Sequence, residues 1–110
     1  LQKDFERIAE GRGCPLRSEK TWSVGHTAFD ERLVKRVRET AEELRYSIHP
    51  MLSGAGHDAV YLNQVAPTAM IFVPSIGGRS HVEVENSRWE DCEAGANVLL
   101  QCLLQSASEV

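Results

Sequence analysis

The fold is decided by residues 53–85, which read SGAGHDAVYLNQVAPTAMIFVPSIGGRSHVEVE. Two histidines, His57 and His81, stand in polar, glycine-rich surroundings on either side of a short apolar run at residues 69–73. A continuous apolar run of this length is typical of a strand that is covered on both faces. Loops beside such a strand commonly carry binding and catalytic side chains. The stretch therefore predicts a metal or substrate site built from two loops next to one buried strand.

Four helical segments are predicted around this strand, at residues 1–13, 30–46, 57–65 and 89–107. In each of them apolar residues recur at helical spacing, with charged or polar residues between them. Asp30 is suited to cap the second helix, because its carboxylate can accept hydrogen bonds from the first backbone N–H groups. The last helix carries a stripe of five apolar residues: Ala96, Leu99, Leu100, Leu103 and Leu104.

Three segments are predicted as strands, at residues 19–26, 47–52 and 68–73, and a long loop follows at 74–88. Trp22 and Val24 alternate within the first of them. Helices that alternate with strands indicate a layered α/β arrangement. Two or three strands with helices on one side cannot cover themselves, so we expect the chain to be the C-terminal part of a larger domain.

Composition narrows the possible partners. The chain has 110 residues, an apolar fraction of 42% and a formal net charge of −4 with mixed signs and no basic face. Binding to nucleic acid or to an anionic membrane surface is therefore poorly supported. No apolar run approaches the roughly 20 residues that a membrane-spanning helix needs.

Cysteine usage favours a reducing compartment. Cys14, Cys92 and Cys102 form no C-x-x-C pair, and an odd number of cysteines does not suit a disulfide framework. Residues 1–13 lack the apolar core of a signal peptide. Because the chain begins without methionine, any targeting segment is expected to lie upstream. We expect a cytoplasmic protein.

His81 is a candidate metal ligand. It follows a glycine pair and precedes two carboxylates, with Glu85 four residues further on. A neutral imidazole is a good ligand for zinc, and a nearby carboxylate can hold the ring or another ligand. This H-x-x-x-E spacing lies in a loop and does not meet the helical metalloprotease motif. The alternative is an exposed loop histidine, since one histidine alone does not make a metal site.

His57 is a candidate for contact with substrate. Gly54 and Gly56 allow close approach of the backbone to a ligand and permit a positive φ. At the start of a helix, His57 and Asp58 can present an imidazole and backbone N–H groups to an anion or a polarised carbonyl. The alternative is a glycine turn in which the histidine serves as a helix cap.

These motifs resemble the two-metal amidohydrolases that include N-carbamoyl-L-amino-acid hydrolase, allantoate amidohydrolase and β-ureidopropionase. That family is related to the aminoacylase and carboxypeptidase metalloenzymes. The resemblance rests on S-G-A-G-H-D-A at 53–59, I-F-V-P-S at 71–75 and G-G-R-S-H at 77–81, followed by Glu85. It covers about residues 50–107 in order, and the combination is specific.

The resemblance implies a role for each matching residue. His81 is implied to be a metal ligand, and His57 to contact the substrate and polarise the scissile carbonyl. The substrate-binding residues are then Gly54, Gly56, His57 and Gly78, with Asp58 and Glu85 in support. The family uses two divalent metal ions, zinc or manganese, and such a pair provides hydroxide at neutral pH from a bridging water. The implied reaction is cleavage of the linear C–N amide bond of an N-carbamoyl amino acid or of a ureido acid such as allantoate.

The resemblance also implies a division of the chain. Residues 1–26 correspond to the last helix and strand of an inserted lid domain, through which the family forms homodimers, and residues 27–110 to the C-terminal part of the catalytic domain. The remaining ligands and the general base have no match here, so we expect the isolated chain to be inactive. Two alternatives stay open: an interaction or dimerisation module without catalytic function, and a metallopeptidase of the dipeptidase or aminoacylase type.

Overall fold

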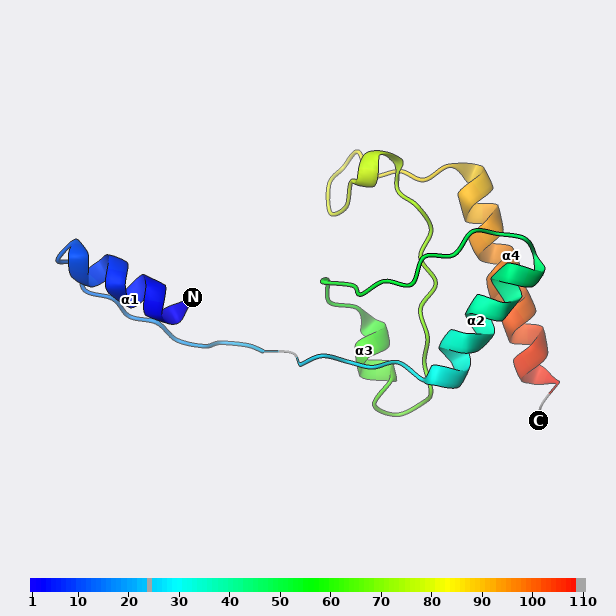
Figure 1. Cartoon of the computed structure of the whole chain (residues 1–110), viewed down its shortest axis with the longest axis horizontal. Coiled ribbons are helices and arrows are strands. Elements are labelled where there is room, and N and C mark those ends of the chain that lie inside the picture. Colours follow the sequence, from blue (N-terminus) through cyan, green and yellow to red (C-terminus); the bar gives the residue numbers. More distant parts are fainter. Residues whose placement is uncertain (24, 109–110) are drawn as a thin grey trace.

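The computed structural model describes residues 1–23 and 25–108. Its helices are α1 (Gln2–Gly11), α2 (Glu31–Glu43), α3 (Asp58–Leu62) and α4 (Trp89–Ala107), with a one-turn 3-10 helix at Ile76–Gly78. In Figure 1, α1 and the extended segment after it lie apart from the part of the chain that contains the other helices. The four predicted helices are therefore confirmed, with the first three shorter than expected.

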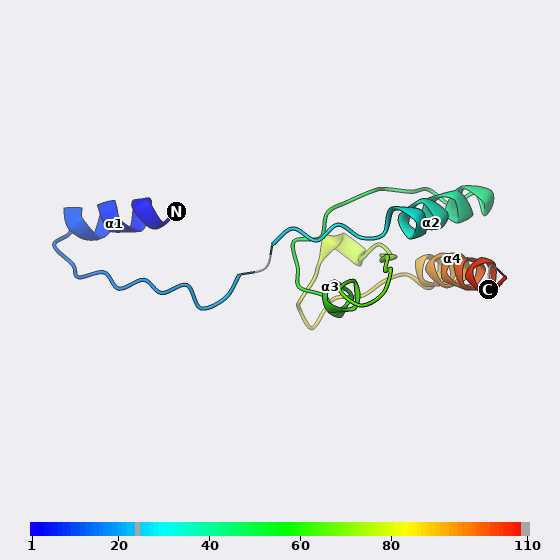
Figure 2. The same cartoon turned by 90° about the horizontal axis from the view of Figure 1, so that it is seen from below.

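The core lies between α2 and α4, which run side by side in both Figure 1 and Figure 2. Its buried side chains are Thr40 and Ala41 on α2 and Val98 on α4. Polar groups join the same two helices. The Arg36 guanidinium donates to Ser106 Oγ at 2.6 Å, and the Thr40 hydroxyl lies 3.3 Å from the Gln105 side-chain oxygen. This pair of helices is the scaffold for the loops of the site.

The first turn of α2 is fixed by Asp30, as the sequence predicts. Its Oδ1 accepts hydrogen bonds from the backbone N–H groups of Arg32 and Leu33, both at 3.0 Å. The backbone N–H of Asp30 donates to the carbonyl oxygen of Thr68 at 3.0 Å, and the Asn63 side chain donates to the carbonyl oxygen of Ala28 at 2.9 Å. The start of α2 is thus tied to the segment that contains the candidate site.

Replacing Asp30 with alanine is expected to lower stability in a pH-dependent way. The Leu33 N–H bond, helped by the positive charge of Arg32, holds the pKa of Asp30 below its ordinary value of 3.8. A lowered folded-state pKa means that the stabilisation is present above pH 3.8 and is lost as the pH falls through the lower, folded value. Urea unfolding should show a lower midpoint for Asp30→Ala at pH 7, and the difference from wild type should shrink on acidification. Glu42→Ala, which removes an exposed carboxylate near the other end of α2, is the control.

The segment at residues 69–73 lies against α4. The segment and the helix together line an apolar groove of about 430 Å³. Its lining residues are Ala69, Ile71, Val73, Cys92, Gly95, Ala96 and Leu99. At one point the contact is too close for any side chain on the helix. A Cβ added at Gly95 would stand 2.5 Å from Cγ1 of Val73. Gly95 therefore sets the distance between the segment and the helix.

Gly95→Ala is expected to destabilise the protein even though alanine favours helix. The gain in helix propensity is about 1 kcal/mol, whereas overpacking commonly costs about 1–3 kcal/mol. Val73 is β-branched and cannot turn its methyl group away without leaving its preferred rotamer. A lower urea midpoint checks this, with Gly11→Ala as the matched control because a Cβ there meets nothing within 4 Å. Adding Val73→Ala to Gly95→Ala should restore part of the midpoint; no recovery would show that another contact is responsible.

The three predicted strands are not formed among the described residues. Residues 19–23, 25–26, 47–52 and 68–73 are extended or irregular, and Val24 lies outside the described residues. A strand requires a neighbour with which its backbone exchanges hydrogen bonds. Within the described ranges, no backbone lies in register beside 69–73, although the carbonyl of Thr68 is used by Asp30. The extended conformation was predicted correctly, and the sheet was not.

Side-chain burial also differs from the sequence prediction. The segment at 69–73 is covered by α4 on one side only, and Phe72 is 49% exposed. The leucine stripe of α4 is exposed, because the face of α4 that meets α2 carries Val98 instead. Trp22 and Trp89 are 69% and 86% exposed. Apolar surface of this extent is normally covered by further polypeptide. No helix in the described residues is long and apolar enough to cross a membrane.

Candidate functional site

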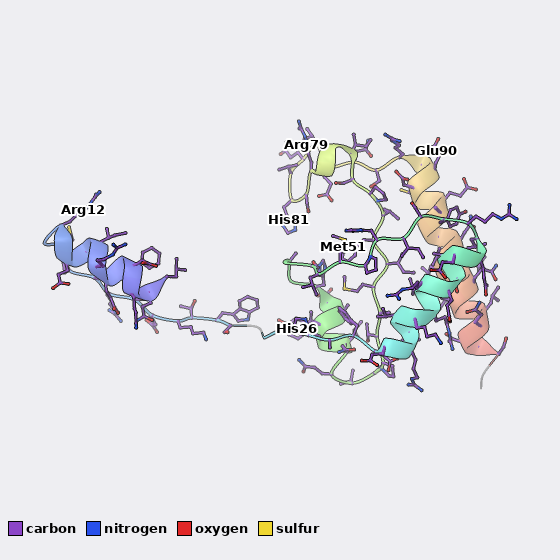
Figure 3. All side chains as sticks on the ribbon, in the orientation of Figure 1. Arg12, His26, Met51, Arg79, His81 and Glu90 are labelled. Atoms are coloured by element: carbon purple, nitrogen blue, oxygen red, sulfur yellow. The ribbon has the colours of Figure 1, made fainter. Side chains whose placement is uncertain are left out.

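The two histidine loops lie at the same end of the structure. Figure 1 and Figure 2 show the bend before α3 and the loop after the 3-10 helix on the side that faces away from the α2–α4 pair. In Figure 3, the His81 side chain points from its loop toward the bend at residues 53–56. The apolar segment 69–73 runs between these loops in the chain, as the sequence predicts. Both loops can therefore border one region of space.

The His57 ring is held by two side chains. Its Nε2 lies 2.6 Å from Oγ of Ser53, and Oγ also accepts a hydrogen bond from the backbone N–H of Ala55 at 3.3 Å. The Phe72 ring meets it edge to face, with ring centroids 5.4 Å apart and an interplanar angle of 64°. Such aromatic pairs favour this angle. His57 is half-buried, and its ring is more restrained than that of a solvated histidine.

The alternative that the His57 side chain caps the helix is wrong. His57 occupies the N-cap position of α3, but its side chain makes no capping hydrogen bond. Its carbonyl oxygen accepts the N–H of Val60 at 3.0 Å, as the backbone of any N-cap residue does. The imidazole is thus directed away from the helix end, toward Ser53 and Phe72. Asp58 begins α3 and is exposed.

His81 has an unusual backbone conformation. Its φ is 60°, in the left-handed region that non-glycine residues rarely adopt. The Glu85 carboxylate accepts a hydrogen bond from the His81 backbone N–H at 2.9 Å, and the N–H of Glu85 donates to the carbonyl of Val82 at 3.0 Å. Glu85 therefore closes the loop through the backbone, whereas the sequence suggests that its carboxylate holds a ring or a ligand. The exposed side chain of His81 projects from this closed turn.

The glycines of the two loops differ. Gly78 has φ 64° and Gly77 has φ 69°, so the turn that leads to His81 requires them. Gly54 and Gly56 do not have positive φ, and a Cβ at either would meet nothing within 4 Å. The conformational reason for those two glycines is therefore wrong. Their use in letting a ligand approach the backbone stays a prediction.

The described residues do not form a complete metal site. Nowhere in ranges 1–23 and 25–108 do three or more histidine, cysteine, aspartate or glutamate side chains gather around one point. Zinc requires about three or four protein ligands. His81 offers one exposed imidazole, and the carboxylate of Glu85 is engaged by the backbone. The three cysteines are free: Cys14 follows α1, and Cys92 and Cys102 both lie on α4.

Sequence reasoning missed Ser53 and Phe72 as partners of His57. Ser53 lacks the G-x-S-x-G elbow of a serine nucleophile, so this motif does not mark it as a catalytic residue. Its position four residues before His57 was the available signal, because a bend with two glycines brings such residues together. Phe72 is fifteen residues further along the chain, and no sequence pattern indicates that its ring meets His57.

Comparison with known proteins identifies the family. Residues 16–105 match peptidase family M20/M25/M40, and the chain belongs to this family. It is 45% identical over its whole length to the N-carbamoyl-L-amino-acid amidohydrolase of Rhizobium meliloti. It is 38% identical, over 97% of its length, to the allantoate amidohydrolase of Escherichia coli. In each case it covers 26% of the relative's length, so the chain spans about a quarter of these proteins.

Solved structures agree with this assignment. The amidase of the hydantoinase/carbamoylase family from Burkholderia multivorans superposes with a TM-score of 0.86 at 47% identity, over 94% of this chain and 25% of that one. A putative amidohydrolase/peptidase from Burkholderia cenocepacia gives a TM-score of 0.79 at 41% identity, over 99% of this chain and 27% of that one. The arrangement of helices and extended segments is thus the same as in carbamoylase-family amidases, and the resemblance seen in the sequence is confirmed.

Proposed function

We propose that the chain works as one part of a longer metal-dependent amidohydrolase that cleaves the linear C–N amide bond of N-carbamoyl amino acids or of ureido acids such as allantoate. The single observation that carries this proposal is the 45% identity, along the whole chain, to a protein named N-carbamoyl-L-amino-acid amidohydrolase. The position of the two histidine loops on the same side of the structure supports it. The exposed apolar surface supports the existence of further covering polypeptide.

Each loop has a role in this proposal. His57 contacts the substrate and stabilises negative charge on the carbonyl oxygen of the scissile group. His81 supplies one ligand for a pair of divalent ions, zinc or manganese, and the other ligands and the general base come from the rest of the polypeptide. The bound ions supply an activated water. Gly54, Gly56 and Gly78 border the substrate, while Glu85 keeps the His81 turn closed.

The full-length protein is the material for the test. Metal is removed with a chelator and replaced by zinc or manganese, and hydrolysis is followed with N-carbamoyl amino acids, allantoate, N-acetyl amino acids and dipeptides. Metal-dependent release of products from the first two substrates is expected. Preference for N-acetyl amino acids or dipeptides would favour the aminoacylase or dipeptidase alternative, and inactivity on all four would favour the interaction module.

The isolated chain of 110 residues is expected to bind metal weakly. Its described residues bring at most two potential ligand side chains together, and one imidazole cannot replace the three or four ligands of a zinc site. Calorimetric titration of the purified chain with zinc checks this. Tight binding of one or two ions per chain would contradict the proposed division of ligands.

We also propose that residues 1–26 belong to a lid domain that forms a homodimer, and residues 27–110 to the catalytic domain. The apolar face of α1 is largely exposed, with Leu1 at 88%, Phe5 at 49% and Ile8 at 51%. Light scattering should show a dimer for the full-length protein and a shift to monomer for Phe5→Glu with Ile8→Glu. Lys3→Glu, on the polar face of α1, is the matched control.

The three free thiols support a cytoplasmic location.

A further inference from the structure

We infer that Ser53 is a positioning residue for His57: its hydroxyl donates to Nε2, holds the ring proton on Nδ1 and turns Nδ1–H toward the substrate. This inference rests on the proposed role of His57 as a partner of the carbonyl oxygen. It assigns a task to a serine that lacks the sequence motif of a nucleophile. The observation is the 2.6 Å contact between Ser53 Oγ and His57 Nε2.

We assign the direction of this hydrogen bond from the second contact of Ser53. The 2.6 Å distance places Ser53 Oγ and His57 Nε2 within hydrogen-bond reach, and a hydroxyl can either donate or accept. The backbone N–H of Ala55 already donates to Oγ at 3.3 Å. That bond orients the Ser53 oxygen and leaves its proton free to point at Nε2. Ser53 thus acts as acceptor from the backbone and donor to the imidazole.

The tautomer of His57 follows from this direction. In a neutral imidazole one nitrogen carries the proton and the other accepts, and the partner of one nitrogen decides the state of the other. With Nε2 accepting from Ser53, the proton is on Nδ1. No other hydrogen bond to the His57 ring occurs within the part of the chain that the structure describes, so Nδ1–H is available as a donor. An N–H group held in this way can donate to the carbonyl oxygen of a bound substrate.

Phe72 restrains the remaining freedom of the ring. Its edge-to-face contact at 5.4 Å and 64° limits rotation about the Cβ–Cγ bond of His57. A ring that is hydrogen-bonded by Ser53 and contacted by Phe72 keeps its Nδ1 edge in a constant direction. Preorganised donors stabilise a developing oxyanion better than donors that must reorient during the reaction.

The first readout is spectroscopic and independent of activity. In the full-length protein labelled with ¹⁵N-histidine, two-bond ¹H–¹⁵N spectra report which ring nitrogen carries the proton, and His57→Ala assigns the signal. We expect His57 in the Nδ1–H form at neutral pH. In Ser53→Ala the signal should shift toward the Nε2–H form that unrestrained histidines favour. An Nε2–H form in the wild type would overturn the inference.

The second readout is kinetic. Loss of one hydroxyl donor commonly costs a few-fold to about tenfold, so Ser53→Ala should lower kcat by roughly fivefold to tenfold with KM little changed. Ser53→Thr keeps the hydroxyl and should restore both kcat and the tautomer, whereas Ser47→Ala, at an exposed serine outside the site, should behave as wild type. If His57→Ala lowers kcat and Ser53→Ala does not, the inference about Ser53 is wrong and the role of His57 stands. If His57→Ala itself leaves kcat unchanged, the proposed role of His57 is wrong, and the spectra still decide whether Ser53 holds the ring.

Discussion

In the full-length protein, His81→Ala is expected to remove one of the two metal ions and nearly all turnover. The His81 side chain is exposed, extends from a closed turn and points toward the bend before α3. When one of three or four ligands is lost, the ion is held weakly. The water that it activates is then no longer held in place. Metal analysis after gel filtration and a steady-state assay with an N-carbamoyl amino acid measure the two losses. Metal content and activity near those of the wild type would make His81 a structural residue.

The backbone at His81 calls for a second variant. Because φ is 60° at this position, a substitution can also act through the shape of the turn. Asparagine is among the few non-glycine residues that tolerate this conformation. His81→Asn therefore keeps the turn while it removes the imidazole. Loss of metal in both variants supports ligation, whereas recovery in His81→Asn alone would mean that the turn, and not the ring, is what the site needs.

His57→Ala is expected to keep both metal ions and to lower turnover by roughly a hundred- to a thousandfold. Removing one preorganised donor to a developing oxyanion has an effect of this size, about 2.7–4 kcal/mol. The His57 ring contacts Ser53 and Phe72 and no acidic cluster, so its loss leaves the ligand loop at 79–85 in place. The measurements are kcat, KM and metal content for the same preparation.

The matched control for this variant is His49→Ala. His49 is exposed in the irregular segment before the bend, and its loss should change kcat by less than about twofold, as for most surface substitutions away from a site. A His57→Ala protein that has lost metal would show that the roles of His57 and His81 are exchanged. A His57→Ala protein with full activity would remove His57 from the reaction.

The candidate site was partly readable from the sequence. The glycines, the histidines and the acid at 85 are local features, and they led to the family to which residues 16–105 belong and to two loops that lie on one side of the structure. The contacts of the side chains could not be predicted as well from the sequence. Glu85 holds the His81 backbone rather than a ring, and Gly54 and Gly56 lack the positive φ that was expected of them. These contacts depend on the conformation of each turn. Loops of similar sequence can close in different ways, so the sequence does not decide which contacts form.

The amino-acid order by itself determined the helices and the N-cap of α2, because helix formation depends on contacts three and four residues apart. It also determined the extended character of 69–73 through its apolar and β-branched residues. Only the tertiary structure decided that Gly95 sets the approach of that segment to α4, and that Ser53 and Phe72 hold the His57 ring. The contacts of Gly95 with Val73 and of Phe72 with His57 join segments whose separation along the chain carries no periodic signal, whereas Ser53 and His57 meet through a local bend. Whether an extended segment becomes a strand depends on a neighbouring backbone, and no local pattern can supply one.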